Sequence, residues 1–166
     1  MINLLYILLL SIPISSIKAN SYGSNLPIPR FASIKSNKVN ARRGPLIKSP
    51  IEWVFVKKGE PIEIIAEYEQ WRQIKDIKGD TGWVHSSVLS GKRSVVILGT
   101  KPVLLTKEDD IKSKIIANIL PDVRCELKIC KGGYCKIRCL AITKYYQGWV
   151  EQKYLWGIYN NLNDQY

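Results

Sequence analysis

The stretch WRQIKDIKGDTGWVHSSVLSG, residues 71–91, carries the strongest structural signal in the chain. Two β-forming runs, 71–75 and 82–85, flank a segment rich in Asp and Gly, which is typical of a hairpin loop. Residues 86–89 are too few for an α-helix and begin with two serines, whose side chains bond back to their own backbone. The stretch therefore predicts a strand, a turn, a second strand, one helical turn and a short closing strand.

The same unit occurs again further along the chain. Gly-Trp-Val at residues 82–84 returns at 148–150, an offset of 66, and Ile-Lys-Ser at 47–49 returns at 111–113, an offset of 64. Self-similarity at a period of roughly 64, with gaps only in expected loops, predicts two copies of one small domain. The second copy is expected to have the longer hairpin loop.

Short motifs over nearly all of the chain beyond residue 25 together resemble a family of exported, tandem bacterial SH3 domains of unassigned role. These motifs are Leu26-Pro27, Pro29-Arg30-Phe31, Asn40-Ala41-Arg42-Arg43-Gly44-Pro45, Pro50-Ile51-Glu52-Trp53-Val54, Lys58-Gly59, Trp71-Arg72, Gly82-Trp83-Val84-His85, Leu89-Ser90-Gly91 and Leu155-Trp156-Gly157. The chain departs from the family pattern at Ala41, at Leu46 and at Tyr134, where the family usually has Trp. The second copy also lacks Gly-Pro in its long loop. The resemblance implies an all-β fold with two tandem small SH3-like barrels.

The expected organisation has five parts. They are a signal peptide at 1–19, an extended N-terminal segment at 20–31, a first bacterial SH3-like domain at 32–98, a second at 99–159 and a C-terminal tail at 160–166. Pro27 and Pro29 enforce an extended backbone, so residues 26–31 are expected to lie along the barrel without regular strand pairing. The apolar run 95–98 is assigned to the last strand of the first barrel or to a strand shared at the junction. The short linker predicts a fixed relative orientation of the domains.

Residues 1–14 are almost wholly apolar, and Ala19 suits the position before a signal-peptide cleavage site. The run is too short and too broken for a membrane span, which needs about 20 apolar residues. No Lys or Arg precedes it, and Ile17 is larger than the small residue preferred there, so an uncleaved anchor and a buried strand remain alternatives. We expect export to the periplasm or cell envelope, with no membrane span after cleavage.

All four cysteines lie within fifteen residues of the second domain: Cys125, Cys130, Cys135 and Cys139. An even count in an exported chain favours disulfides, and without two C-x-x-C pairs a zinc site is the weaker alternative. Residues 131–134 form a turn, which places the cysteines in pairs on the two arms of a hairpin. In an antiparallel hairpin the numbers of facing residues have a constant sum. That sum is 265 for Cys130 with Cys135 and 264 for Cys125 with Cys139, so a one-residue bulge between the pairs reconciles both registers. We therefore expect Cys130 to pair with Cys135 and Cys125 with Cys139, and no metal or cofactor.

Nothing in the sequence forms a catalytic constellation. The one histidine, His85, follows a Trp-Val pair at a strand end and is expected at the surface or rim. Phosphate-binding loops, metal-ligating His clusters and dinucleotide fingerprints are absent from the sequence. The acidic residues of the first domain are expected on solvated strand faces. We predict that the protein is not an enzyme, and a hydrolase that uses His85 is the minor alternative.

The chain carries 25 Lys and Arg against 14 Asp and Glu, a formal net charge of +11. Both halves share the excess, so no nucleic-acid stripe stands out; the charge suits anionic envelope polymers, lipid headgroups or acidic peptides, or is ordinary solubility charge. The resemblance implies an SH3-type groove that takes an extended peptide. Its candidate ligand-binding residues are Arg42, Arg43, Trp53, Tyr68 and Trp71. Trp83 and Trp149 are the aromatic residues most expected in the cores.

The sequence thus favours a non-catalytic, exported binding module for a peptide or a peptidoglycan-like polymer. The alternative is a structural partner of another envelope protein. A nucleic-acid partner is not expected.

Overall fold

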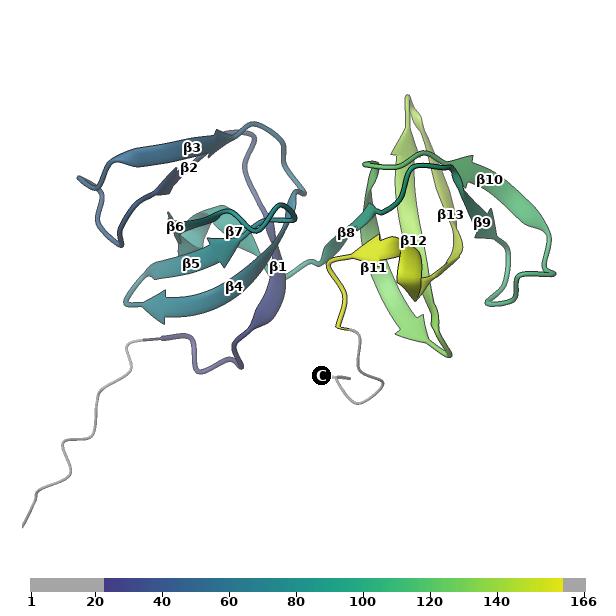
Figure 1. Cartoon of the computed structure of the whole chain (residues 1–166), viewed down its shortest axis with the longest axis horizontal. Helices are drawn as coiled ribbons and strands as arrows, with labels where there is room; N and C mark the ends of the chain where they lie inside the picture. Colours follow the sequence, from purple (N-terminus) through teal and green to yellow (C-terminus); the bar gives the residue numbers. More distant parts are fainter. Residues whose placement is uncertain (1–22, 160–166) are drawn as a thin grey trace, which may run out of the picture.

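The structure is a computed structural model that describes residues 23–159. The predicted signal peptide at 1–19 and the tail at 160–166 therefore lie outside the described residues. Within this range the chain forms two seven-stranded antiparallel sheets, which confirms the all-β prediction (Figure 1). The described part contains no helix with the length and apolar content needed to span a bilayer.

The first sheet contains every element predicted for residues 71–91. Its strands lie in the order β3-β2-β6-β5-β4-β1-β7, and the 3₁₀ turn Ser86–Val88 separates β6 from β7. Their bounds are β1 (Arg30–Ile34), β2 (Val39–Arg42), β3 (Ile51–Phe55), β4 (Pro61–Tyr68), β5 (Trp71–Lys75), β6 (Thr81–His85) and β7 (Leu89–Ser90).

The second sheet repeats the first strand by strand. Its order is β10-β9-β13-β12-β11-β8-β14, so each strand takes the place of the strand numbered seven lower, and a second 3₁₀ turn, Gln152–Tyr154, precedes the last strand. The bounds are β8 (Ser94–Ile97), β9 (Val103–Thr106), β10 (Ile115–Ile119), β11 (Arg124–Lys131), β12 (Tyr134–Ala141), β13 (Lys144–Glu151) and β14 (Leu155–Trp156).

Two strands differ from the sequence assignment. The run 95–98, assigned to the first barrel, lies mostly in β8, which pairs with β11 and β14 of the second sheet. Arg30 and Phe31, assigned to an unpaired segment, pair with β4 as part of β1. All four β8 residues are buried, so the run shows no alternation of apolar and polar residues that would indicate which sheet it joins.

The hairpin of the second domain also differs from its prediction, because its loop is not longer. β12 and β13 have eight residues each with only Ile142 and Thr143 between them, whereas β5 and β6 have five residues each. The additional residues lengthen the strands and form an arm that projects from the sheet, at the top of the second domain in Figure 1. We call residues 138–147 the hairpin arm.

Each sheet closes around its own core. The first core is aliphatic except for Phe55, and the second includes three half-cystines, Cys125, Cys135 and Cys139. The disulfides join Cys125 to Cys139 and Cys130 to Cys135, the pairing that register counting favours. The expected bulge lies between Leu127 and Ile129, where the register shifts by one residue.

The two domains contact one another across a connector of three residues, 91–93. The Arg124 guanidinium of β11 binds the Glu60 carboxylate of the first domain through Nη2–Oε1 at 2.8 Å and Nε–Oε2 at 2.9 Å. The Ser94 hydroxyl donates to the Gly59 carbonyl at 2.6 Å. The Phe31 ring meets the Trp156 ring edge-on at 5.4 Å between centroids. Polar and aromatic contacts together hold the junction.

Loss of the Arg124 contact is expected to loosen this junction. Arg124→Ala removes two hydrogen bonds to Glu60 at a partly exposed site, worth about 1 kcal/mol, and leaves each core intact. Small-angle scattering should then show a broader range of interdomain distances. Arg138→Ala, which removes an ion pair within the second sheet, is the matched control. An unchanged distribution in Arg124→Ala would show that the other junction contacts, the Ser94 hydrogen bond and the aromatic pair among them, are sufficient to hold the junction.

Candidate functional site

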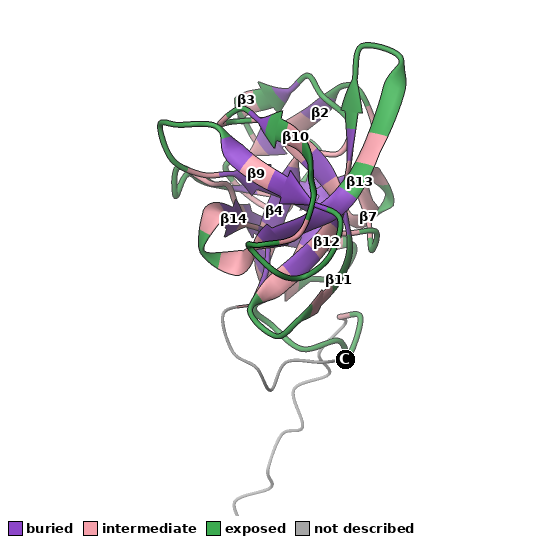
Figure 2. Ribbon diagram, turned by 90° about the vertical axis from the view of Figure 1, so that its right-hand side faces the viewer, coloured by how far each residue is buried: buried purple, intermediate pink, exposed green. Residues whose placement is uncertain are grey.

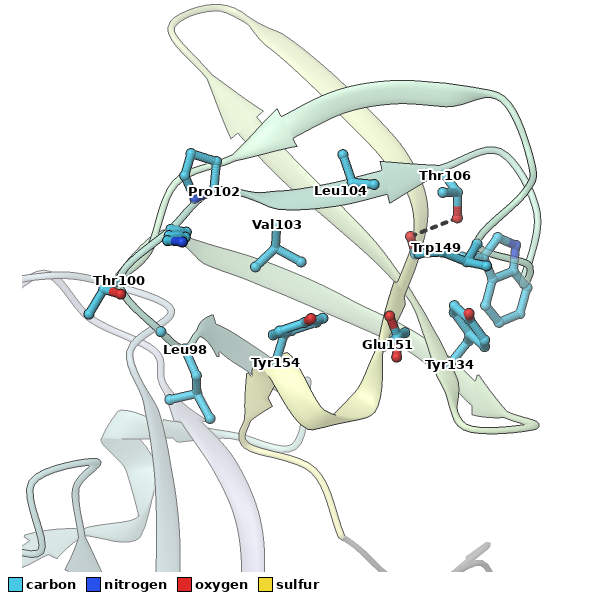
Figure 3. A pocket seen from close by; sticks show the side chains of 13 residues that line it. Leu98, Thr100, Pro102, Val103, Leu104, Thr106, Tyr134, Trp149, Glu151 and Tyr154 are labelled. Carbon is cyan, nitrogen blue, oxygen red and sulfur yellow. Dashed lines mark hydrogen bonds between the residues drawn. The ribbon is translucent and has the colours of Figure 1, made fainter.

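A cavity of about 360 Å³ opens on the second domain (Figure 3). Its floor and sides come from the segment 98–106, from the start of β12, from the end of β13 and from the 3₁₀ turn that follows. The lining residues are Leu98, Gly99, Thr100, Lys101, Pro102, Val103, Leu104, Thr106, Ile111, Tyr134, Trp149, Glu151 and Tyr154. Apolar and aromatic side chains dominate, which is typical of ligand pockets.

Trp149 reaches the cavity because the Gly-Trp-Val motif alternates in direction. Val150 is 1% exposed and belongs to the core, so Trp149 points to the opposite face of β13. Gly148 faces inward, where the Thr106 carbonyl and the Leu105 side chain occupy the space that a Cβ would need. The glycine thus lets β13 approach β9 closely, and this approach forms the cavity wall.

Two further aromatic residues complete the wall. Tyr134 lies beside Trp149 at one end of the cavity, and Tyr154 lies toward the segment 98–103 (Figure 3). The Thr106 hydroxyl lies 3.2 Å from the Trp149 carbonyl oxygen and 2.7 Å from that of Glu108, so it ties β9 to β13. Lys131 Nζ lies 4.9 Å from the Trp149 ring centroid and covers its outer side.

The charged groups of the lining are Glu151 and Lys101. Glu151 accepts from Lys153 Nζ at 2.6 Å, and this hydrogen bond raises the pKa of Lys153. Aromatic faces with one carboxylate and one ammonium group suit an extended ligand that carries both an amine and an acid. The Thr106 hydroxyl is engaged by carbonyl groups and has no histidine beside it among the lining residues, so the cavity lacks the parts of a nucleophilic site.

The five ligand-binding residues predicted in the first domain lie on or directly beside the four strands β2 to β5, and a shared groove among them stays a prediction. Arg42 Nη1 donates to the Ser49 carbonyl at 2.8 Å, and Arg43 Nε pairs with Glu52 at 2.5 Å, so both hold the long loop. Tyr68 and Trp71 are cross-strand neighbours, where β4 ends and β5 begins.

Trp53 is half-buried. It packs against the first core, 6.0 Å from Phe55 between ring centroids, and its buried Nε1 has no hydrogen-bond partner within the described residues. A Cβ on Gly82 would approach the Trp53 ring to 2.9 Å, so the indole lies under the glycine. Its place in a ligand-binding groove stays a prediction.

Trp83, predicted in the first core, faces outward, whereas Trp149, predicted in the second, is buried at 8% exposure, on the face of β13 opposite to Val150. Val84, 0% exposed, takes the core position, and Trp83 is a half-buried neighbour of Arg42 and Gln73 on the other face. Side chains alternate between the two faces of a strand, so a valine in the core places the neighbouring tryptophan on the opposite face. Sequence reasoning missed this signal. His85 is exposed, as expected; its Nδ1 accepts from the Ser87 backbone N–H at 3.3 Å and caps the 3₁₀ turn.

Glu67, predicted on a solvated face, is half-buried instead. Its side chain is 9% exposed and binds Arg30 and Arg72, the latter at 2.9 Å from Nε to Oε1. Residues 23–159 contain no group of three or more His, Cys, Asp or Glu side chains placed to hold a metal ion.

Comparison with known proteins identifies the first sheet. Residues 35–91 match the bacterial SH3 domain family, and no catalytic domain is among the matches. No curated protein matches the chain. Among solved structures, NlpC2 from Trichomonas vaginalis aligns at 11% identity over 77% of this chain and 48% of its own, with a TM-score of 0.35.

NlpC1 from the same organism aligns at 11% identity over 81% of this chain and 48% of its own, also with a TM-score of 0.35. The chain thus spans about half the length of these two proteins. Residues 35–91 are a bacterial SH3 domain, and with the second sheet in the same strand order the chain is a tandem of two SH3-like domains.

Proposed function

We propose that the protein is a non-catalytic, exported binding module that takes a peptide segment of a peptidoglycan-like envelope polymer in the cavity of its second domain. The observation that carries this proposal is the wall formed by Tyr134, Trp149 and Tyr154. Trp149 is buried, Tyr134 and Tyr154 are half-buried, and Tyr154 also packs against the second core of aliphatic residues and half-cystines.

The chemistry of the cavity fits such a peptide. Aromatic faces offer contact area at a low cost in conformational entropy, and an extended peptide lies flat against them. Glu151 can exchange its bond with Lys153 for a ligand amine, and Lys101 can pair with a ligand carboxylate. A stem peptide of a wall polymer carries both groups.

Two features support a place outside the cytoplasm. Disulfides form and persist in oxidising compartments, and this domain has two of them. The formal net charge of +11 favours association with anionic polymers at low ionic strength. Export itself remains a prediction from residues 1–19.

Tyr154→Ala is expected to weaken binding of soluble stem-peptide fragments about tenfold, because it removes one aromatic face at the centre of the cavity. Calorimetric titration gives the affinity, and sedimentation with purified sacculi tests the polymer. Tyr145→Ala, on the hairpin arm away from the cavity, is the matched control and should bind normally. Equal affinity of the two variants would place the ligand elsewhere.

A partner protein at the domain junction is the second candidate. A cavity of about 430 Å³ lies there, lined by Lys35, Lys58, Lys92, Arg93 and Arg124 among others, and only Arg124 of these five is in an ion pair within the described residues. Capture of an acidic envelope protein, without sedimentation on sacculi, would favour this alternative.

A further inference from the structure

The tip of the hairpin arm exposes three large apolar side chains. Leu140 is 51% exposed, Ile142 98% and Tyr145 56%. Leu140 and Tyr145 are cross-strand partners, and Ile142 stands in the turn beside them. Figure 2 shows this hairpin as exposed beyond the buried part of β13. The three side chains therefore form one apolar tip on a projecting element.

The residue at the turn is unfavourable for folding. Ile142 has φ of +56°, in the left-handed region that favours Gly, Asn or Asp and that a β-branched side chain rarely adopts. A side chain that is almost fully exposed gains no packing in return. The apolar tip is thus maintained against a conformational cost, without a contact among residues 23–159 that offsets it.

The tip is also held rigidly. Cys139, two strand positions behind the turn region, is joined to Cys125 of the neighbouring strand β11. Its cross-strand partner Tyr146 packs against the second core. The arm therefore presents its tip in a fixed direction, and little conformational entropy is lost when the tip binds another surface.

Basic groups surround the apolar tip. Arg138 Cζ lies 4.6 Å from the Tyr145 ring centroid, and Lys144 Nζ lies 5.2 Å from that of Tyr146. Arg138 and Lys128 share the carboxylate of Glu126, so three cations less one anion leave a local charge of +2. Long basic side chains beside tyrosines are typical of the boundary between lipid headgroups and acyl chains.

We propose that the hairpin arm inserts its tip into the interface of a membrane that contains anionic lipids. Leu140, Ile142 and the Tyr145 ring would enter the acyl boundary, while Arg138 and Lys144 contact phosphate groups. A convex tip with a basic surround suits a lipid surface, which deforms around it. A protein partner would have to supply a matching groove.

This inference is independent of the proposed function. Tyr134, at the cavity, begins β12, and the tip lies at its other end, roughly 25 Å away at about 3.3 Å per residue. The cavity and the arm can therefore be occupied at the same time, and each proposal can be tested with substitutions that leave the other site unchanged.

The substitution Ile142→Gly distinguishes a role of the apolar tip in membrane binding from a role in folding. Glycine accepts the positive φ, so the Tm of the second domain is expected to stay the same or rise by about 3 °C. Cosedimentation of the full chain with mixed phosphatidylcholine and phosphatidylglycerol vesicles is expected to fall about tenfold. Lys144→Gln should lower binding to the mixed vesicles about fivefold and leave binding to pure phosphatidylcholine vesicles unchanged.

Tyr154→Ala, in the cavity, is the control and should bind vesicles like the unmodified chain. Equal vesicle binding by Ile142→Gly and the unmodified chain would overturn the proposal, because any binding would then come from another part of the chain. Absence of vesicle binding by the unmodified chain would also overturn it. A protein that the unmodified chain captures and Ile142→Gly does not would then identify the tip as a protein contact.

Discussion

Reduction of both disulfides is expected to unfold the second domain while the first domain stays folded. A domain of about 60 residues has a marginal core, and here three buried members of that core are half-cystines. The bond between Cys125 and Cys139 spans 14 residues and that between Cys130 and Cys135 spans 5. By loop-closure entropy the first bond contributes at most about 3 kcal/mol and the second at most about 2 kcal/mol to the free energy of unfolding.

Hydrogen exchange with and without reductant measures this effect for each domain. We expect amides of β11, β12 and β13 to lose protection, while β4, β5 and β6 keep theirs because the first domain has no cysteine. Cys125→Ser with Cys139→Ser should cost more stability than Cys130→Ser with Cys135→Ser. Simultaneous loss of protection in both sheets would mean that the junction makes them one cooperative unit.

Glu67→Gln is expected to destabilise the first domain by about 3 to 5 kcal/mol and to lower its Tm by roughly 15 °C. The carboxylate accepts from the Arg30 guanidinium, from the Ser24 hydroxyl at 2.8 Å and from the Ser24 backbone N–H at 2.6 Å. Arg72 Nε binds the same oxygen as Arg30, and its side chain is only 9% exposed. Without Glu67 the Arg72 charge stays buried and uncompensated, and the segment before β1 loses its attachment.

The same carboxylate makes the stability of the first domain depend on pH. Burial acts to raise the pKa of Glu67, but hydrogen bonds from Arg30 and Ser24 outweigh it and lower the pKa from 4.5 to about 2. Because the folded pKa lies below the unfolded one, this contribution is complete above about pH 4.5 and is lost as the pH falls toward 2.

Thermal unfolding followed at several pH values tests both the destabilisation by Glu67→Gln and the pH dependence that Glu67 causes. The unmodified chain should lose stability between pH 4.5 and 2, and Glu67→Gln should show a smaller loss over the same window. Glu69→Gln, at an exposed position two residues further on, is the control and should follow the unmodified chain. A parallel decline of all three chains would assign the acid sensitivity to other carboxylates.

The parts of the fold that follow from local pattern could be predicted from the sequence. The period of roughly 64 residues predicts two domains, and the turn at 131–134 with its two register sums predicts both the bulge and the cysteine pairing. The assignment of residues 94–97 could not be made in this way. That choice is tertiary, because a fully buried strand looks the same in sequence whichever sheet it joins.

The candidate site was less accessible to sequence reasoning. The direction of Trp83 depends on which residue of Gly-Trp-Val enters the core, and a large apolar tryptophan is by composition a better core candidate than valine. In the first domain the Trp53 indole already lies under Gly82, and Trp83 lies on the other face of β6. Glu67 was missed because its partner Arg30 lies 37 residues away in sequence, beyond the reach of charge patterns read along one strand.

In each sheet the first strand of the repeat pairs with the last: β1 with β7, and β8 with β14. Every strand of a sheet therefore comes from one stretch of about 64 residues, and the two ends of that stretch lie next to each other. A crossing-over that duplicates or deletes one such stretch of the gene would leave no strand of the remaining sheets without its partner. The number of binding domains can thus change in a single genetic step, without the evolution of a new sheet edge.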